Sequence, residues 1–393
     1  MIDTRYLVVG GGMTGDAACR GILDVDPDPD AVLLLSAESH PPYARPPLTK
    51  SLWQGKAEST IWRQTAELGV RERLGRRVVE LDLVARTAVD DRGDTYVYEK
   101  LLLATGGRPR RLPAGGDDVI YLRTIDDYHR LRRLADAGAR VVVIGGGFIG
   151  SEIAAALALN GTPVTIVFPE AGIGARVFPA PLSASLNDYY RERGVHVVAG
   201  ATVTGIRSGF VMLGNGRTFP ADAVVAGLGI EPNVELAEAA GLPVAGGIVV
   251  DAFGRAGGRD DVFAAGDVAM FPGGPLGGFR RVEHEDHAKR HGRLVGANMA
   301  GAAEPYEHLP FFYSDLFDLG YEAVGELDSR LDTLTEIDEL DAKGRICYLG
   351  RDRRPRGVLF WNVFGEVEAG RSLIAAGDVV PREASAAVGG IGR

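Results

Sequence analysis

The chain alternates short, wholly apolar runs with longer helical stretches. Three of the apolar runs stop directly on a glycine: Tyr6–Val9, Val141–Ile144 and Val262–Ala265. A short apolar run that ends at a turn residue is typical of a strand buried on both faces. Strands that alternate with helical stretches predict a parallel α/β fold.

Two of these strands lead into the same local unit. The segments GGGMTG (residues 10–15) and GGGFIG (residues 145–150) each follow a buried strand and open an Ala-rich helix, 135 positions apart. In such a turn the first glycine makes the bend, the second lets a pyrophosphate approach the backbone, and the third lets helix pack on strand. The phosphates then lie at the helix N-terminus. We therefore predict two dinucleotide-binding folds, with six glycines at the phosphates: Gly10, Gly12, Gly15, Gly145, Gly147 and Gly150.

Each turn is followed by a second strand and an acid. Such an acid, about 20 positions on, is expected to hold the adenosine ribose. Residues 32–35 lead to Glu38, one position later than expected, and residues 164–167 lead to Glu170. The alternative for either glutamate is a solvated loop carboxylate. Glu170 favours NADH over NADPH because it repels a 2'-phosphate, whereas Arg176 nearby would reverse that preference.

Composition narrows the class of protein. The net charge is -10, which argues against nucleic-acid binding, because that function needs a positive field. No run approaches the ~18 apolar residues of a membrane span. The N-terminus has no basic region of the kind that begins a signal peptide. We expect a cytoplasmic protein without a membrane span.

The chain has two cysteines, Cys19 and Cys347, which form neither CxxC nor CxxxxC. They cannot supply a disulfide framework or a cysteine-rich metal site. Redox chemistry therefore cannot use a thiol pair within the chain.

Two further turns fit a flavoprotein. Two nucleotide folds suggest one flavin held permanently and one nicotinamide that visits. The segments LLLATGGRP (residues 101–109) and VFAAGDV (residues 262–268) are where such a protein closes its FAD site. They supply Thr105, Gly106, Gly266 and Asp267, with Asp267 expected to accept hydrogen bonds from the ribityl chain. Alone, each segment could also form a plain strand and turn.

Other segments carry a family resemblance. They are YARPPLTKSLW (43–53), GGGFIGSE (145–152), GLGIEPNVELA (227–237), VEHEDHAKRHGRLVGANMAG (282–301), FYSDLFDLGYEAVG (312–325) and LFWNVF (359–364). The chain resembles the FAD-dependent pyridine-nucleotide oxidoreductases of the ferredoxin and rubredoxin reductase type. Within them it is most similar to the bacterial relatives of apoptosis-inducing factor. The resemblance extends from the first strand to about Ala375.

The resemblance implies the domain organisation. We expect two Rossmann-like domains of the glutathione reductase type, one for FAD (residues 1–113 and 243–309) and one for NAD (114–242). A C-terminal α+β domain (310–393) should follow, because aromatics and strand-like runs such as 345–349 and 357–361 become frequent after Pro310. Within the first domain, residues 86–99 alternate around Asp-Asp-Arg-Gly, which predicts a β-hairpin.

The resemblance also implies four catalytic residues: Lys50, Glu152, Phe148 and His284. Lys50 would lie close to flavin N5, where an ammonium stabilises developing negative charge. Glu152 would pair with Lys50 and order the nicotinamide, and Phe148 would shield the flavin. His284 would begin a helix whose dipole favours negative charge at the flavin N1/O2 edge. The alternatives are a surface lysine for Lys50 and a core aromatic for Phe148.

Further contacts follow from the same resemblance. Arg45 would lie on the flavin. The other FAD contacts are Glu38, Lys50, Thr105, Gly106, Gly266, Asp267, Glu283, His284 and Tyr313, and the other NAD contacts are Glu152, Glu170, Gly229 and Glu231. Tyr313 stands where apoptotic members carry Trp, so weaker stacking is expected. His284, His287 and His291 share one helical face, but the resemblance explains this segment better than a metal does, and we expect no metal.

The expected function is that of an electron-transfer flavoprotein. Tightly but non-covalently bound FAD would take hydride from NADH, or NADPH, at N5 and pass electrons to ferredoxin or rubredoxin. Four arginines in RDRRPR offer a basic docking patch, or form a solvated hairpin: Arg351, Arg353, Arg354 and Arg356. One alternative function is a slow NADH redox sensor with a long-lived charge-transfer complex of reduced flavin and NAD+, acting through dimerisation or partner binding. Another is an NADH oxidase or quinone reductase.

Overall fold

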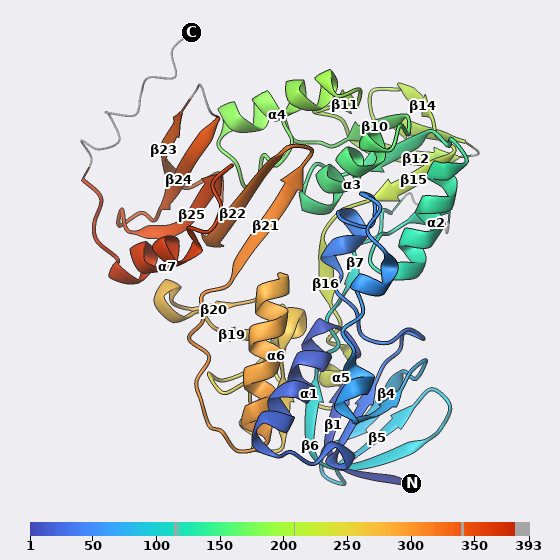
Figure 1. The fold of residues 1–393 in the computed structure, drawn as a ribbon, viewed down its shortest axis with the longest axis vertical. Helices are drawn as coiled ribbons and strands as arrows, with labels where there is room; N and C mark the ends of the chain where they lie inside the picture. The colour runs from blue at the N-terminus through green and yellow to red at the C-terminus, as the bar shows by residue number, and fades with distance from the viewer. Residues whose placement is uncertain (114–115, 117, 208, 339–341, 382–393) are drawn as a thin grey trace. The chain divides into compact units, whose positions relative to one another are not determined.

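The computed structural model describes residues 1–113, 116, 118–207, 209–338 and 342–381 (Figure 1). The chain divides into two units. Unit 1 consists of Met1–Arg45, Glu58–Arg108 and Glu231–Pro310, and unit 2 consists of Pro46–Ala57, Pro109–Ile230 and Phe311–Arg393. The division groups most of the predicted NAD-binding domain with the C-terminal one, and the finer domain boundaries stay a prediction.

Unit 1 is built on a mainly parallel sheet. Its strands follow the order β3-β2-β1-β6, with β18 paired to the end of β6, as a Rossmann-type fold requires. Their bounds are β1 (Ile2–Val9), β2 (Val32–Leu35), β3 (Arg71–Arg73), β6 (Thr95–Leu103) and β18 (Val262–Ala264). Both faces of the sheet are covered, which explains the unbroken apolar run of β2 and the apolar C-terminal halves of β1 and β6.

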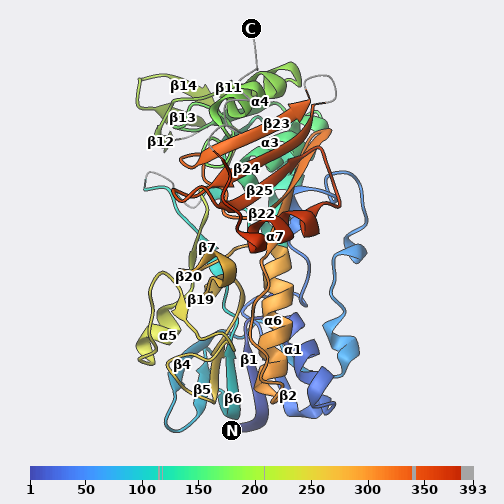
Figure 2. The same cartoon turned by 90° about the vertical axis from the view of Figure 1, so that its left-hand side faces the viewer.

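Two helices cover one face of this sheet. Helices α1 (Met13–Val25) and α6 (Glu285–Met299) lie side by side (Figures 1 and 2). A Cβ on Gly296 of α6 would lie 2.2 Å from the carbonyl oxygen of Ala18 of α1, so the two helix backbones are almost in contact. Their apolar side chains pack with Val8 and Leu34 of the sheet. The strand–turn–helix unit of α1 is thereby fixed in place.

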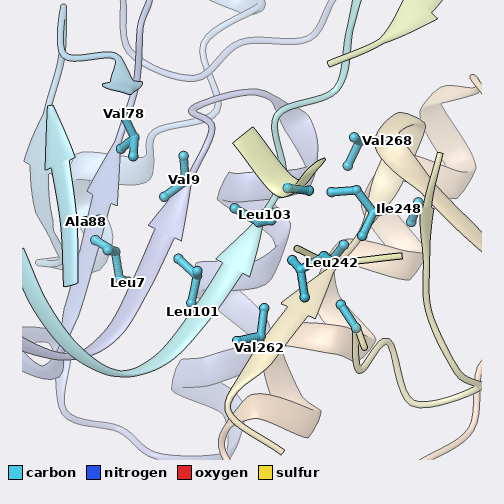
Figure 3. Packing of buried hydrophobic residues seen from close by; sticks show 14 of the residues in the cluster. Leu7, Val9, Val78, Ala88, Leu101, Leu103, Leu242, Ile248, Val262 and Val268 are labelled. Atoms are coloured by element: carbon cyan, nitrogen blue, oxygen red, sulfur yellow. The ribbon is translucent and has the colours of Figure 1, made fainter. Parts of the chain in front are cut away.

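The other face of the sheet carries a second apolar cluster. Leu7, Leu101 and Leu103 point into it, and Leu242 and Ile248 cover them (Figure 3). The smaller elements of unit 1 lie around this face and along the sheet edge: β4 (Val78–Asp82), β5 (Thr87–Asp90), α5 (Glu235–Ala239), β17 (Ile248–Val249), β19 (Ala269–Pro272) and β20 (Phe279–Arg280).

The predicted hairpin at residues 86–99 is confirmed. Strand β5 pairs antiparallel with β6, with Ala88 opposite Tyr96. The buried carboxylate of Asp90 closes the turn, because it accepts bonds from the N–H groups of Arg92 and Asp94 and from the hydroxyl of Tyr96.

Unit 2 contains a second parallel sheet, in the order β11-β10-β9-β15-β8. Its elements are β8 (Val119–Ile120), α2 (Ile125–Asp136), β9 (Val141–Ile144), α3 (Phe148–Leu159), β10 (Val164–Val167), α4 (Ala180–Glu192), β11 (His196–Val198) and β15 (Ala223–Ala226). A small antiparallel sheet adds β12 (Val203–Arg207), β13 (Phe210–Leu213) and β14 (Thr218–Pro220). The chain leaves and re-enters unit 1 through β7 (Gly107–Pro109) and β16 (Ile230–Pro232).

The C-terminal part of unit 2 is an antiparallel sheet, in the order β21-β22-β25-β24-β23. Its elements are β21 (Phe311–Leu316), β22 (Leu319–Gly325), β23 (Asp332–Asp338), β24 (Lys343–Leu349), β25 (Pro355–Trp361) and the helix α7 (Val367–Ala376). Helix α7 packs on β22 and β25. Phe178, which follows β10, meets the rings of Tyr321 and Trp361 edge to face.

The predicted fold class is confirmed. Two mainly parallel sheets each contain a unit of strand, glycine turn and helix, and an antiparallel sheet with a helix follows. Among the described residues, none of the helices combines the length and the apolar character that crossing a membrane requires.

Candidate active site

The first glycine turn joins β1 to α1 in unit 1. Gly10 has φ +123°, and a Cβ there would lie 2.1 Å from the carbonyl oxygen of Ala104. A Cβ on Gly15 would lie 2.0 Å from the carbonyl oxygen of Gly10, so neither position accepts a side chain. Gly12 instead faces space at the helix N-terminus, with a guanidinium nitrogen of Arg45 4.0 Å from a Cβ there. Free N–H groups and the helix dipole favour an anion at this place, so the turn fits a pyrophosphate.

Glu38 lies beside this turn with two hydrogen-bond donors. The hydroxyl of Tyr43 donates to it at 2.6 Å and the guanidinium of Arg45 at 2.5 Å. Burial opposes the charge of Arg45, but Glu38 and Tyr43 outweigh it and raise the pKa of Arg45. The structure thus brings together the predicted Glu38 and Arg45, at the phosphate turn. The contribution of Tyr43 was missed, although Tyr43 begins the YARPPLTKSLW segment.

Thr105 and Gly106, which follow β6, are tied to Asn233. The hydroxyl of Thr105 donates to the carbonyl oxygen of Asn233 at 2.9 Å, and the Asn233 amide donates back at 2.8 Å. The N–H of Asn233 donates to the Gly106 carbonyl at 3.0 Å. Glu231, predicted to contact NAD, pairs with Arg108 at 2.6 Å. Sequence reasoning missed Asn233, which lies in the quoted segment GLGIEPNVELA.

The turn after β18 is held by one side chain of α6 and by another from the loop before that helix. The N–H of Gly266 donates to Nδ1 of His291 at 3.2 Å, so this ring nitrogen acts as an acceptor. Arg281 donates to the carbonyl oxygen of Asp267 at 3.1 Å and pairs with Glu283 at 2.6 Å. The predicted residues Gly266, Asp267 and Glu283 therefore lie in one hydrogen-bonded region of unit 1.

His284 is the N-cap residue of α6, and its carbonyl accepts from the N–H of Ala288. Burial lowers the pKa of His284 and of His287 to about 4 and lowers that of His291 as well. The three rings are therefore neutral at pH 7. His287 lies 2.9 Å from the hydroxyl of Tyr306 through Nδ1. Within the described part of the chain, no three His, Cys, Asp or Glu side chains gather as metal ligands do.

The second glycine turn, in unit 2, joins β9 to α3 and repeats the first. Gly145 has φ +111°, and a Cβ there would lie 2.4 Å from the carbonyl oxygen of Gly227. A Cβ on Gly150 would lie 1.9 Å from the carbonyl oxygen of Gly145. Among the described residues no atom comes within 4 Å of a Cβ on Gly147 or on Gly229. This helix N-terminus is therefore also open to a phosphate.

Glu170 follows β10 and pairs with Arg176 at 2.7 Å. The Arg176 side chain is 84% exposed and that of Glu170 is 25% exposed. The backbone around the arginine is tied to the C-terminal sheet, since the Arg176 carbonyl accepts from the N–H of Ser329 and the Val177 carbonyl from Tyr348. Glu170, which is expected to bind the ribose, and Arg176, which is expected to reverse the preference for NADH, thus form one ion pair at the surface.

Glu152, in the second turn of α3, is the centre of a buried network in unit 2. Its carboxylate lies 2.6 Å from Nζ of Lys50, with side chains 6% and 11% exposed. The hydroxyls of Thr49 and Ser314 each donate to Glu152 at 2.6 Å. Both carboxylate oxygens are therefore hydrogen-bonded, and the ammonium faces its counter-ion. The structure brings Lys50 and Glu152 together as predicted, whereas Thr49 and Ser314 were missed although they lie next to predicted residues.

Two aromatic groups accompany this pair. The ammonium of Lys50 lies 5.3 Å from the ring centre of Tyr313, which suits a cation–π contact. Phe148 begins α3 and is 38% exposed, and its ring meets that of Phe312 edge to face at 5.6 Å. Phe148 is therefore not the core aromatic of the alternative interpretation.

The arginines in the turn between β24 and β25 form hydrogen bonds and an ion pair with other residues of the same chain. Arg353 donates to the carbonyl oxygen of Val380 at 2.8 Å, and Arg356 pairs with Glu326 at 2.8 Å. Arg354 also donates to a carbonyl of the segment after α7. These contacts favour a structural hairpin over a docking patch.

The two cysteines are free and buried, Cys19 in unit 1 and Cys347 in unit 2. Burial raises the pKa of Cys19, and it raises that of Cys347 to about 11. Both thiols are therefore protonated at neutral pH, and a protonated thiol is a poor nucleophile.

Two parallel sheets, each with a glycine turn open at the helix N-terminus and an acid after the second strand, define a protein that binds two dinucleotides. Comparisons with known proteins agree with this class of protein. Residues 4–292 match the family described as pyridine nucleotide-disulphide oxidoreductase, and residues 295–340 match the C-terminal region of mitochondrion-associated apoptosis-inducing factor. The chain belongs to the pyridine nucleotide-disulphide oxidoreductase family and is an FAD-dependent NAD(P)H oxidoreductase.

The relatives cover nearly the whole chain. Apoptosis-inducing factor 1 of Dictyostelium discoideum is 34% identical over 94% of this chain and 78% of its own length. The ferredoxin–NAD(+) reductase component of the anthranilate 1,2-dioxygenase system of Burkholderia cepacia is 33% identical over 95% and 94%. The crystal structure of the covalent putidaredoxin reductase–putidaredoxin complex matches with a TM-score of 0.88 at 30% identity, over 99% of this chain and 100% of that chain. The chain is thus a ferredoxin reductase-like oxidoreductase.

Proposed function

We propose that the protein oxidises NADH and passes the electrons singly to a small iron–sulfur protein of the ferredoxin or rubredoxin type. The buried Lys50–Glu152 pair is the observation that carries this proposal. A shielded ammonium is suited to stabilise negative charge that develops during hydride transfer. A disulfide acceptor within the chain would need two neighbouring cysteines, and the two in this chain lie in different units. The acceptor is therefore external.

Each dinucleotide has its own set of residues in this proposal. FAD, when bound, supplies a ring that accepts hydride and gives up electrons one at a time. The turn at Gly10–Gly15, with Glu38 and Arg45, holds its phosphates and ribose. The turn at residues 145–150 and Glu170 hold NADH. Lys50 stabilises negative charge at the reacting atoms, and Glu152 orients Lys50 through the ion pair between them.

The Glu170–Arg176 pair supports NADH as the preferred nucleotide. The guanidinium already has a carboxylate partner at 2.7 Å. A 2'-phosphate would have to compete with that carboxylate and then lie beside its negative charge, and both requirements disfavour NADPH.

The relatives support a small iron–sulfur protein as the acceptor. The Burkholderia relative is a ferredoxin–NAD(+) reductase component, and the solved structure contains putidaredoxin. An anaerobic NADH titration of the yellow protein tests the proposal when it is followed by ferredoxin and then by air. Rapid reoxidation by ferredoxin and slow reoxidation by oxygen are expected. Fast reoxidation by oxygen or by a quinone alone would contradict it.

The role of Lys50 can be tested separately. Lys50→Ala should slow flavin reduction by NADH about 100-fold in stopped flow, because stabilisation of the developing charge is lost. Lys56→Ala, an exposed lysine on the same segment, is the matched control and should reduce at the normal rate. An unchanged rate in Lys50→Ala would remove Lys50 from the reaction.

A second candidate function is a slow redox sensor, which Phe148 favours. An exposed aromatic ring at the start of α3, supported by Phe312, is suited to stack on a bound ring and delay its release. In that case a long-wavelength absorption band would persist for minutes in air after NADH addition, and ferredoxin would not discharge it.

A further inference from the structure

The Lys50–Glu152 pair lines a cleft in unit 2. The cleft is small and open to solvent, with a volume of about 20 Å³, and Asn160, Asp315 and Phe317 are among its other lining residues. It contains three ionisable side chains, and the proposed function uses two of them, Lys50 and Glu152. Asp315 is the third.

Strand β21 brings Asp315 to this place. Side chains alternate along a strand, so Tyr313 and Asp315 lie on the same face. The ring of Tyr313 lies below the Lys50 ammonium, and Asp315 lines the cleft that Lys50 also lines. Ser314, between them, donates to Glu152 at 2.6 Å. One strand therefore supplies a hydrogen bond to the ion pair and places a carboxyl group beside it.

The surroundings of Asp315 favour its protonated form more than those of a surface aspartate do. Burial raises the pKa of Asp315, the charge of Lys50 lowers it, and the charge of Glu152 raises it, with a net rise. Lys50 and Glu152 are the charged groups that face Asp315, from the segment before Trp53 and from α3. A half-buried carboxyl group of this kind can take up a proton from inside the protein and release it to water.

The proposed reaction requires such a group, and this inference rests on that proposal. NADH gives up two electrons and one proton as a hydride. Two one-electron iron–sulfur carriers remove the two electrons, so one proton must leave the site for each NADH. Lys50 and Glu152 are only 11% and 6% exposed, which leaves them little contact with water.

We propose that Asp315 carries this proton from the Lys50–Glu152 pair to water at the mouth of the cleft. Among the described residues no hydrogen bond or ion pair joins Lys50 directly to Asp315, although both line the cleft, so the proton passes through a water there. An N–H bond of the Lys50 ammonium breaks, the water takes that proton and gives up another, and an O–H bond forms on Asp315. The lysine nitrogen takes the proton left behind by the two-electron oxidation, so the ammonium is restored. Asp315 then gives its proton to water. Asp315 acts through Lys50 and not on the cofactors themselves.

The test compares three variants of the FAD-loaded protein: Asp315→Asn, Asp315→Glu and Asp318→Asn. Asp318 lies three residues further on, is 71% exposed and pairs with Arg193, so its variant is the matched control. Stopped flow follows flavin reduction by NADH without oxygen, and then reoxidation by ferricyanide, a one-electron acceptor. A pH indicator in weak buffer follows proton release, in H2O and in D2O.

We expect Asp315→Asn to slow proton release and reoxidation about 10- to 100-fold, with a larger solvent isotope effect, and to change flavin reduction much less. Asp315→Glu should restore most of the rate, and Asp318→Asn should behave as the unchanged protein. Proton release from Asp315→Asn at the normal rate across the pH range would overturn the proposal.

An infrared difference spectrum of the unsubstituted protein during reoxidation gives a second readout that does not depend on the stability of Asp315→Asn. A transient carboxylic acid band that shifts in Asp315→Glu is expected, and its absence would overturn the proposal. A different result would contradict the proposed function itself: flavin reduction by NADH at the normal rate in Lys50→Ala.

Discussion

The two glycine turns have the same backbone but different surroundings. In unit 1, Glu38 accepts from both Tyr43 and Arg45, and the neighbouring Gly266 turn is held by His291. In unit 2, the corresponding acid, Glu170, pairs with an arginine that is 84% exposed. The glycine motif is thus typical of a dinucleotide site in both units. The residues around it determine how far the side chains of the site are fixed before the ligand binds.

The contacts of Glu38 should contribute more free energy than the ion pair of Glu170. A hydrogen bond to a charged group within a protein contributes about 1.5–3 kcal/mol, whereas an exposed ion pair contributes about 0–1 kcal/mol. A site whose side chains are already fixed loses less entropy when the ligand binds. The difference supports the proposal that the flavin stays bound in unit 1 and the nicotinamide nucleotide exchanges in unit 2.

Alanine at the first glycine of each turn should give the largest effects. Gly10→Ala and Gly145→Ala each force a side chain into a positive φ and against a carbonyl oxygen, at 2.1 and 2.4 Å. A loss of about 3 kcal/mol or more is expected in the unit concerned. Gly10→Ala should be purified with little FAD, and Gly145→Ala should keep FAD but lose NADH binding.

The flavin absorbance of the purified protein and an NADH titration measure both outcomes. Gly12→Ala and Gly147→Ala separate folding from binding, because both positions face space and should fold normally, while the added methyl group stands where the pyrophosphate approaches the backbone. The same loss of FAD from Gly10→Ala and Gly145→Ala would show that the turns do not serve different ligands.

Acid should destabilise unit 1 through its buried histidines. Folding lowers the pKa of His284 and His287 from 6.5 to about 4, so the unfolded chain binds protons first as the pH falls. Stability should therefore be constant above pH 6.5 and decline between pH 6.5 and 4. Flavin release monitored by fluorescence against pH measures the decline, and His287→Phe should make it shallower. Equal pH dependence in His287→Phe would assign the loss to other groups.

The two acids should separate the two nucleotides. Glu38→Ala should lower the FAD content, because Tyr43 and Arg45 lose their common acceptor. Glu170→Ala should weaken NADH binding about 10- to 100-fold and leave FAD in place, since hydrogen bonds to a charged group are lost. Equal loss of both nucleotides in either variant would contradict the assignment of the two folds.

Arg176→Ala should have the smallest effect. The side chain is 84% exposed, so its ion pair contributes about 0–1 kcal/mol, and the melting temperature should hardly change. The ratio of NADH to NADPH turnover should rise a few-fold, because a cation that attracts the 2'-phosphate is removed. A fall in that ratio would show that Arg176 positions Glu170 for NADH.

Local patterns predicted the parts of this structure that depend on local backbone. The two turns and the hairpin at residues 86–99 follow from glycine positions and alternation, and each is in the structure. The pairing of Lys50 with Glu152 could not be predicted in this way, because no local pattern relates the two residues. It was predicted from the family resemblance alone. Ser314 and Asn233 were missed because their partners, Glu152 and Thr105, lie 162 and 128 positions away. Such contacts depend on how whole elements pack.

The segment Pro46–Ala57 belongs to unit 2 although unit 1 precedes and follows it in the chain. Lys50 is therefore synthesised well before its partner, and Thr49 and Glu152 are 103 positions apart. At about 5–20 residues per second, a ribosome needs roughly 5–20 s to add those residues. During this time the lysine segment has no site to join.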